Sequence, residues 1–379
     1  MINKRLLIKK LLSHNDENSF YDKKQQLDFS TKVGKAKFIK HICAMSNSNP
    51  ENNSYIVVGI EDETNKILGV DFFDDSKIQH LVNAYLVNSP KVHYENVGFP
   101  KLQKHKVVGL ITIHPTPKTS SFKRNSWKYP RQTIFYRRGS NSVPITGNFD
   151  LPNTNKDIVE AIEKSARNNI ELTLGGVFDF FKNHDQEYTP QYKVFKEQFV
   201  ICWAGKKKVV DEKIFYSRVD IELVNEQVRL FYSALDEVKI SFNNSSFIIT
   251  EYVKLGINEA YDYYPLEKTV IHFKDNGKHD IIQELLFKAP AYDKKVLHHI
   301  YNTNNALLEK LQSNHSLTDD EQKDIEDFPT TFLICALNGF EKAKTKLQES
   351  KNHLRKLKDK TSYIQYKDSM RILRKVKYQ

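Results

Sequence analysis

The stretch from residue 118 to residue 141 interleaves cationic and aromatic side chains, a pattern suited to contact with a nucleic acid. Lys and Arg can follow a phosphate backbone while aromatic rings stack on unpaired bases. Arg137 and Arg138 offer guanidinium groups for two-point phosphate contacts, and Gly139, Ser140 and Asn141 follow with exposed backbone amides. The alternative is an ordinary basic loop whose Trp127 packs on the protein body. The other candidate contacts in this stretch are Lys123, Arg124, Lys128 and Arg131.

Acidic side chains form a second group. Glu17 and Asp22 stand five residues apart with Lys24 two positions later, and Asp62 follows the apolar run Tyr55–Ile60. The sequence has no Gly-x4-Gly-Lys-Ser/Thr, Gly-x-Gly-x-x-Gly or His-Glu-x-x-His motif. It therefore gives no support for a nucleotide-binding loop or a zinc protease site. An acid at the end of a buried strand can also be a simple turn residue.

Composition indicates a globular protein of two or three domains. The chain has 379 residues, of which 39% are hydrophobic, and its three cysteines form no Cys-x-x-Cys pair. The sequence contains no run of about 18 apolar residues, which a membrane-spanning helix would need. The cysteine usage fits a reducing cytoplasm. Thirteen Lys or Arg against four acids in residues 341–379 contribute +9 of the net charge of +11. We therefore expect a basic tail of two amphipathic helices that could neutralise phosphates or simply be solvated.

The hydrophobic periodicity predicts an α+β protein. An amino-terminal α/β domain with a mixed sheet is expected over residues 1–150, a mixed α/β region over 151–279, and a helical, basic part over 280–379. The boundary near Ile145–Thr154 rests on clustered Gly, Asn and Pro residues. The expected amino-terminal elements are a helix at Lys35–Met45, a doubly buried strand at Tyr55–Ile60, strands at Ile67–Phe72, Lys91–Val97, Val107–His114 and Thr133–Arg137, and a loop at Pro115–Pro130.

The second half is expected to begin with mixed elements and to end with helices. Its expected elements are a helix at Lys156–Arg167, strands at Phe195–Trp203, Lys213–Val219, Gln227–Leu235 and Ser246–Thr250, and helices at Ile281–Leu286, Lys295–Leu311 and Asp319–Cys335. This half carries no motif that indicates chemistry, and a structural or partner-binding role is its default interpretation.

Four blocks of the amino-terminal region, in order, resemble the Schlafen-type AlbA-like nucleic-acid domain, often labelled divergent AAA. Glu17–Lys24 is similar to the family's Glu-Ser-x-x-x-Glu-Phe-Lys element, and Ile42–Asn47 to its Ser-Ala-Phe-Ala-Asn helix end. Tyr55–Asp62 resembles the Leu-Ile-Gly-Val-Asp-Asp strand, and Phe135–Asn141 the closing Tyr-x-Arg-x-Gly-Ser block. The resemblance covers about residues 10–150.

The resemblance implies chemistry at three acids. Members of the Schlafen group are metal-dependent endoribonucleases, and their acids correspond by position to Glu17, Asp22 and Asp62, which would hold Mg²⁺ or Mn²⁺. Such an ion polarises the phosphoryl oxygen and stabilises the leaving oxygen. Lys24 beside them would contact nucleic acid. A second register of the first block would use Asp28 in place of Asp22.

Two interpretations of function follow. One is a cytoplasmic, metal-dependent endoribonuclease that acts on tRNA or another structured RNA, a role that would suit host defence. The other is a non-catalytic DNA- or RNA-binding regulator or assembly subunit, as many relatives are labelled only DNA-binding or ATP-binding. One such domain supplies one wall of an RNA clamp, so the resemblance also implies a homodimer.

Overall fold

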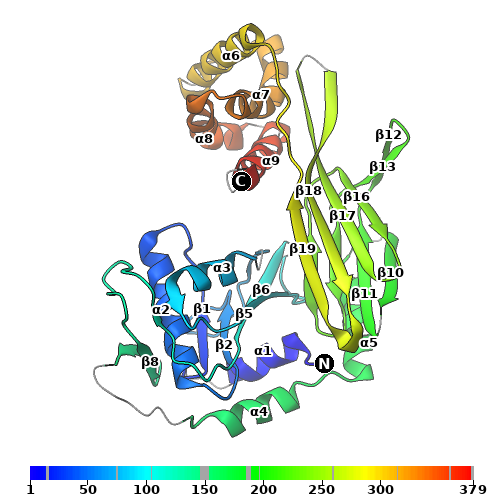
Figure 1. Ribbon diagram of the computed structural model, residues 1–379. Helices are drawn as coiled ribbons and strands as arrows, with labels where there is room; N and C mark the ends of the chain where they lie inside the picture. Colours follow the sequence, from blue (N-terminus) through cyan, green and yellow to red (C-terminus); the bar gives the residue numbers. More distant parts are fainter. Residues whose placement is uncertain are drawn as a thin grey trace. The chain divides into compact units, whose positions relative to one another are not determined.

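The computed structural model describes residues 1–13, 17–73, 76–103, 105–145, 153–184, 189–195, 197–257, 260–313, 315–357 and 360–376 (Figure 1). The chain divides into two units. The amino-terminal unit comprises Met1–Ala204, Asp220–Tyr232 and Asp275–Gly277, and the carboxyl-terminal unit comprises Gly205–Val219, Ser233–Lys274 and Lys278–Gln379.

A nine-stranded mixed sheet forms the centre of the amino-terminal unit. Its order is β1-β2-β6-β5-β15-β14-β11-β10, with β3 also paired to β6. Strands β1 and β2 run parallel, whereas the other neighbours are antiparallel, so the expected mixed sheet is confirmed. The strands are β1 (Tyr21–Lys24), β2 (Ser54–Val58), β3 (Val70–Asp71), β5 (Val92–Val97), β6 (Lys106–Ile113), β10 (Thr189–Phe195), β11 (Gln198–Ala204), β14 (Asp220–Leu223) and β15 (Val228–Tyr232).

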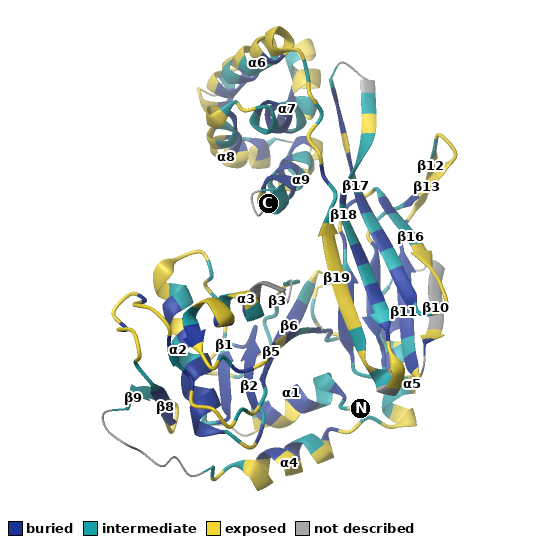
Figure 2. Ribbon diagram, in the orientation of Figure 1, coloured by how far each residue is buried: buried dark blue, intermediate teal, exposed yellow. Residues whose placement is uncertain are grey.

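Helices cover both faces of this sheet where β2 and β6 lie (Figure 2). Successive side chains of a strand point to opposite faces. Tyr55 and Val57 pack with helices α1 (Lys4–Ser13) and α4 (Lys156–Ser165), whereas Ile56 and Val58 pack with α2 (Lys32–Ser48) and α3 (Ser76–Tyr85). The continuous apolar run at Tyr55–Ile60 is thereby explained, because β2 is buried on both sides.

Helix α2 begins and ends close to its predicted bounds. The Thr31 side chain accepts a hydrogen bond from the backbone of Gly34 and so caps the first turn. The inner face of α2 buries Phe38, Ile39 and Ile42. Since this helix lies over the β1 and β2 end of the sheet, its side chains can reach residues of β1.

Short strands complete the amino-terminal unit. The segment expected as a loop, residues 115–130, contains only the two-residue strand β7 (Ser121–Phe122), paired with β4 (Leu86–Val87). Strands β8 (Phe135–Arg138) and β9 (Asn141–Pro144) form a hairpin, with Gly139 at φ 58° in its turn. Helix α5 (Ile170–Asn183) packs Phe180 against the sheet.

The carboxyl-terminal unit contains an antiparallel sheet of order β12-β13-β16-β17-β18-β19 and four α-helices within its described residues. The prediction of a helix at Ile281–Leu286 is wrong, because residues 281–285 belong to β19, which pairs with β18 along its length. The elements are β12 (Lys207–Val210), β13 (Lys213–Tyr216), β16 (Val238–Phe242), β17 (Ser246–Ile257), β18 (Ala260–Phe273), β19 (His279–Leu285), α6 (Lys294–Gln312), α7 (Asp319–Leu337), α8 (Glu341–Lys356) and α9 (Thr361–Val376).

The basic tail forms two helices, as predicted. Helix α8 ends at Lys356 and α9 begins at Thr361, so the tail consists of two separate helices. Across the described part of the chain, the helices are too short or too polar to span a membrane.

Candidate nucleic-acid interface and acidic pair

Strand β1 places Asp22 and Lys24 on the same face of the sheet. The two residues are separated by one position, and side chains two apart along a strand share a face. The Asp22 side chain is completely buried, and the Lys24 ammonium donates to its Oδ1 at 2.8 Å. The parallel pairing of Asp22 with Ile56 of β2 fixes this position from the interior of the sheet.

Glu17 joins Asp22 to form an acidic pair. Its Oε1 accepts a hydrogen bond from the Lys23 backbone at 3.0 Å and lies 3.5 Å from the Lys24 ammonium. Burial and the neighbouring Asp22 carboxylate raise the pKa of Glu17 above its ordinary value. Lys24 therefore lies against two carboxylates at once, and it compensates their mutual repulsion.

Arg137 and His41 lie beside the Oδ2 atom of Asp22. The guanidinium of Arg137 is completely buried, lies 3.7 Å from Asp22 Oδ2, and donates to the Asn18 carbonyl at 3.2 and 3.1 Å. His41 Nδ1 lies 3.6 Å from the same carboxylate oxygen and 3.2 Å from Arg137 Nη1. Asp22 Oδ2 itself is buried without a hydrogen-bond partner. Arg137 thus acts within the site, and its expected direct contact with phosphate stays a prediction.

His41 is neutral at physiological pH. Burial lowers its pKa to about 3, with Lys24, Lys40 and Arg137 adding to the effect. Because Arg137 donates to Nδ1, the imidazole proton belongs on Nε2. The sequence offered no signal for this residue, which is a single histidine in an amphipathic helix.

A buried polar network attaches the β8–β9 hairpin and the preceding loop to the end of α2. The Asn47 amide donates to the carbonyls of Phe135 and Ser120 at 2.8 and 2.9 Å, and its oxygen accepts from Ser120 at 2.7 Å. The Arg137 backbone donates to Ser48 Oγ at 2.7 Å. Since these groups are buried and paired, the loop that carries the basic and aromatic residues is fixed relative to α2.

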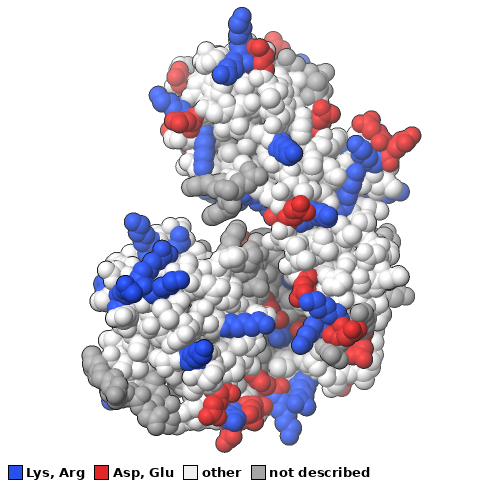
Figure 3. Space-filling view, viewed as in Figure 1, with Lys and Arg blue, Asp and Glu red and all other residues white. Residues whose placement is uncertain are grey.

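Trp127 and three lysines form what we call the basic-aromatic surface: Lys37, Lys40, Trp127 and Lys128. The Trp127 side chain is 49% exposed, and the ammonium groups of Lys128 and Lys37 lie 4.6 and 5.9 Å from its ring centre. Burial, with Arg137, Lys128 and Lys37 nearby, lowers the pKa of Lys40. On the face drawn in Figure 3, Lys and Arg side chains gather near α2 and α3.

Helix α2 connects this surface to the acidic pair. Lys37, Lys40 and His41 are spaced three and four residues apart, so they share one face of the helix. Lys37 contacts Trp127 at one end of this row, and His41 contacts Arg137 beside Asp22 at the other. The two groups of residues singled out in the sequence are therefore joined through helical residues that sequence reasoning missed.

The other predicted basic contacts are placed around this surface. The Arg124 guanidinium lies over the Tyr85 ring at 4.1 Å, and the Arg131 backbone donates to Asn125 Oδ1. Lys123, Arg124, Arg131 and Arg138 are all exposed. Trp127 does not pack wholly on the body, but its ring edge meets Tyr129 at 5.5 Å, and Tyr129 belongs to the core.

Two family models match the chain. The family described as "Schlafen, AlbA_2" matches residues 17–146, which contain the acidic pair and the basic-aromatic surface. The family described as "Domain of unknown function (DUF5929)" matches residues 157–379. The chain belongs to the DUF5929 family. Its amino-terminal region, residues 17–146, matches the Schlafen AlbA_2 domain. A search of the curated proteins finds no match to the chain.

In the Schlafen AlbA_2 domain, Asp62 lies outside the group in which Lys24 contacts both Glu17 and Asp22. Its side chain is exposed, and its backbone carbonyl accepts from the Lys23 ammonium, which also donates to Asn65 Oδ1 at 2.7 Å. Lys23 points to the opposite face of β1 from Asp22. Among the described residues, no three His, Cys, Asp or Glu side chains are grouped so that they could hold a metal ion.

Asp28, the alternative to Asp22, has a local structural role. Its carboxylate accepts hydrogen bonds from the backbone and side chain of Ser30 at 2.9 and 2.7 Å, and from Thr31. Hydrogen bonds from Thr31 and Ser30 lower its pKa to about 2. Asp28 therefore stabilises the turn that leads into α2.

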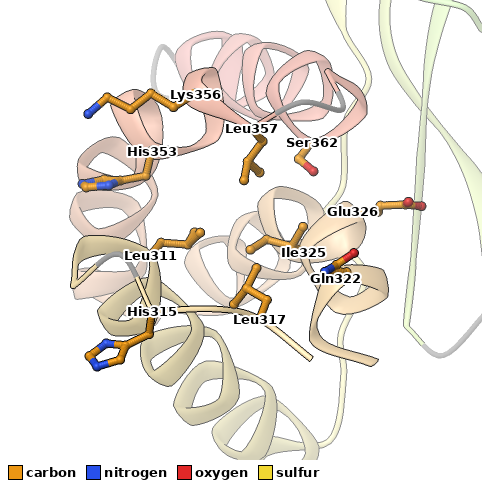
Figure 4. A pocket seen from close by; sticks show the side chains of 10 residues that line it. All are labelled: Leu311, His315, Leu317, Gln322, Ile325, Glu326, His353, Lys356, Leu357 and Ser362. Carbon is orange, nitrogen blue, oxygen red and sulfur yellow. The ribbon is translucent and has the colours of Figure 1, made fainter. Parts of the chain in front are cut away.

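The DUF5929 region contains a separate cavity of about 540 Å³ among its carboxyl-terminal helices (Figure 4). Leu311, Ile325 and Leu357 contribute apolar side chains to its lining. In Figure 4 the imidazoles of His315 and His353 lie at one side and Gln322 and Glu326 at the other. This volume is within the range of small-molecule sites, and the lining combines apolar contact with polar groups at the rim.

Proposed function

We propose that the Schlafen AlbA_2 domain binds structured RNA that presents unpaired bases, such as tRNA, along the basic-aromatic surface. The observation that carries this proposal is the half-exposed Trp127 ring between two lysine ammonium groups. Stacking of a base on such a ring tolerates any sequence, and the flanking cations pair with the phosphates on either side. We further expect the protein to act in the cytoplasm, where its three buried, free cysteines would stay reduced.

The electrostatics of Lys40 support phosphate binding. Burial and three neighbouring cations lower the pKa of Lys40, so its charged form is less stabilised than that of a lysine in free solution. An anionic phosphate would relieve this repulsion. The same reasoning favours a nucleic acid over a neutral ligand, and it makes the affinity depend on salt.

Replacing Lys37, Lys40 and Lys128 together with alanine should weaken tRNA binding roughly 10- to 30-fold and reduce the slope of log K against log salt by about 2 to 3. Fluorescence anisotropy at several salt concentrations measures both quantities. The matched control replaces three exposed lysines of α6 and α7, Lys294, Lys295 and Lys323. An equal loss in the control would mean that net charge alone drives binding, and that the surface is not the site.

Replacing Trp127 with alanine should reduce affinity about tenfold for RNA with unpaired bases, because base stacking on an aromatic ring contributes roughly 1–3 kcal/mol. Binding to a blunt RNA duplex should be nearly unchanged. Trp127→Phe retains a stacking face and should keep most of the affinity. Equal losses on loops and duplexes would contradict the stacking role, and stronger binding to DNA of the same sequence would redirect the proposal to DNA.

As a second function, we propose that the acidic pair is a cleavage centre for the bound RNA, with Mg²⁺ or Mn²⁺. The supporting observation is the buried Asp22 carboxylate, whose Oδ2 accepts no hydrogen bond and lies 3.7 Å from Arg137, together with Glu17, whose pKa is raised. Carboxylate oxygens are the donors that such an ion prefers, and the ion would polarise the phosphoryl oxygen.

The fit of the pair to a metal ion is incomplete. Lys24 already places its ammonium against both carboxylates, so an ion held by Glu17 and Asp22 would have to displace it. Asp62, the third acid that the resemblance implies, is exposed on the turn held by Lys23. Glu17 and Asp22 would hold the ion, Arg137 and His41 would orient Asp22, and a displaced Lys24 would be available to the phosphate.

A further inference from the structure

One face of the sheet in the carboxyl-terminal unit carries aromatic and cationic side chains. Every second residue of β17 from position 247 to position 255 is buried, whereas the residues between them are partly or fully exposed (Figure 2). Tyr252 and Lys254 belong to the exposed set. Lys254 pairs with Tyr263 of β18, and Thr250 pairs with Lys239 of β16, so these residues share one face. This face is the one opposite the buried side of the sheet.

Phe215 of β13 packs against both tyrosines of this face. Its ring centre lies 5.0 Å from that of Tyr263 with the two rings stacked, and 5.3 Å from that of Tyr252 with the rings edge to face. Phe215 is 1% exposed, whereas Tyr252 and Tyr263 are half-buried. The tyrosine rings are therefore held in place by a buried ring and keep part of their surface in solvent. A ring that is already held loses little conformational freedom when a ligand stacks on it.

Lysine side chains lie against these rings. The Lys208 ammonium is 5.4 Å from the ring centre of Tyr263, and the Lys239 ammonium is 5.0 Å from that of Tyr252 and 5.2 Å from that of Phe215. Contacts of this kind occur about once per 70–80 residues in proteins, so three on one face set it apart from an ordinary solvated sheet. We call this group the tyrosine–lysine face: Lys208, Lys213, Lys239, Tyr252, Lys254 and Tyr263.

The tyrosine–lysine face has more positive charge than its acidic neighbours balance. Among the described residues, Lys208 is paired with Glu237 at 3.2 Å, and the other three lysines of the face form no ion pair. Burial and the neighbouring Lys213 lower the pKa of Lys239. An anionic ligand would relieve the repulsion between these lysines.

We propose that the tyrosine–lysine face binds a single-stranded segment of nucleic acid, at a second site outside the Schlafen AlbA_2 domain. Tyr252 and Tyr263 are diagonal neighbours on adjacent strands, about 7–8 Å apart, so two bases of one strand can stack on them. The ammonium groups that lie on the rings would then pair with the phosphates on either side. This site goes beyond the RNA binding proposed for the amino-terminal domain, and it needs neither Trp127 nor the acidic pair.

The combination of rings and lysines favours a single strand over other polyanions. An acidic protein segment would balance the lysines but would leave the half-buried tyrosine rings without a stacking partner. A duplex presents phosphates but keeps the faces of its bases stacked on one another. A single strand offers both groups at once, so we expect binding that depends on salt and on unpaired bases, with little dependence on sequence.

Fluorescence anisotropy with a labelled oligouridine of about 12 nucleotides tests this site in full-length protein that carries Trp127→Ala. Adding Tyr252→Ala and Tyr263→Ala should weaken the remaining binding at least about tenfold, whereas phenylalanine at both positions should retain most of the affinity. The matched control is Tyr363→Ala on α9, where Lys367 lies 5.1 Å from the Tyr363 ring centre. Absence of any remaining binding, no effect of the double alanine variant, or an equal loss in the control would overturn the proposal.

The lysines provide a second test that leaves the rings in place. Lys239→Gln with Lys254→Gln should reduce the slope of log K against log salt by about 1 to 2. The control pair is Lys207→Gln with Lys288→Gln, two exposed lysines of which Lys207 lies on the opposite side of β12 from Lys208. An equal change for both pairs would show that net charge governs binding, and the proposal would fall.

Poly-glutamate serves as the competing polyanion. If it bound as tightly as oligouridine and lost affinity in the lysine variant but not in the double tyrosine variant, the face would belong to an acidic protein segment and the proposal would be overturned. The two RNA-binding proposals can also fail separately. The effect of Trp127→Ala on the wild type tests the amino-terminal surface, whereas the changes at Tyr252 and Tyr263 test this second site.

Discussion

Replacing Glu251 with glutamine should lower the free energy of unfolding of the carboxyl-terminal unit by about 3 kcal/mol. Glu251 is a buried residue of β17, 1% exposed, and its carboxylate accepts from Arg371 at 2.7 Å and Lys375 at 2.5 Å, both on α9. Lys375 also pairs with Glu267 of β18. Burial opposes ionisation of Glu251, but Arg371 and Lys375 outweigh it and lower the pKa to about 2.

The magnitude follows from this pKa. A decrease from 4.5 to about 2 corresponds to about 3 kcal/mol of preference for the ionised carboxylate in the folded state. Glutamine retains the shape but not the charge, so two cations would lose their anionic partner. Urea denaturation followed by circular dichroism measures the change.

The control is Glu349→Gln, which breaks the exposed pair with Lys346 on α8. Exposed pairs contribute little, so we expect a change within about 0.5 kcal/mol. Equally small effects for both variants would show that the bond between α9 and the sheet contributes nothing to stability.

The same carboxylate predicts a pH dependence. Because the folded pKa of Glu251 is below the unfolded value, its stabilisation is complete above pH 4.5 and is lost as the pH falls from 4.5 towards 2. The wild type should therefore lose stability more steeply than Glu251→Gln across this interval. Parallel curves for the two proteins would contradict the assignment.

The role of α9 shows what charge patterning can and cannot predict. The sequence correctly indicates two basic amphipathic helices, but the excess of Lys and Arg suggests phosphate as their partner. Arg371 and Lys375 instead bind Glu251, which lies 120 residues or more away in the chain. The acid in a β-branched strand carries no local sign of its partner, so the pairing could not be predicted from either segment.

Secondary structure could be predicted from the sequence for elements that are buried on both faces or on one face only. Tyr55–Ile60 and Lys35–Met45 follow the periods of a doubly buried strand and an amphipathic helix, and both are observed as β2 and α2. The run Ile281–Leu286 has the composition of a helix, yet its pairing with β18 overrides that preference. Strand β15 pairs with β5 although their paired residues are more than 100 positions apart, a contact that no local pattern encodes.

The candidate site was predictable in its residue types more than in its geometry. The resemblance to Schlafen domains identifies Glu17 and Asp22, which the structure brings together. Arg137 was predicted to contact phosphate, which stays a prediction, and the sequence did not indicate that its guanidinium is buried against Asn18 and His41. His41 and Lys40 were not predicted, because their spacing along one face of α2 forms no recognised sequence motif. Tertiary packing of α2 over β1 gives them their place.

Asp22→Asn should abolish RNA cleavage by the proposed centre, with a rate at least about 100-fold below the wild type. Asparagine keeps the size of the buried side chain but removes the charge that faces Lys24, Arg137 and His41. The assay incubates purified full-length protein and total tRNA with Mn²⁺ or Mg²⁺, with EDTA as the blank. RNA affinity and circular dichroism of the variant must match the wild type, and Glu17→Gln, at a partly exposed position, provides a second variant if Asp22→Asn fails to fold.

Asp62→Asn distinguishes an acidic pair from a three-acid centre. Its carboxylate is exposed, and the turn is held by its backbone carbonyl, so we expect cleavage within about threefold of the wild type. A loss as large as that of Asp22→Asn would mean that the turn rearranges to bring a third carboxylate to the ion. Absence of cleavage by the wild type with either ion would remove the nuclease proposal. The RNA-binding proposal would then stand on Trp127 and its lysines alone, because their contacts do not involve the acidic pair.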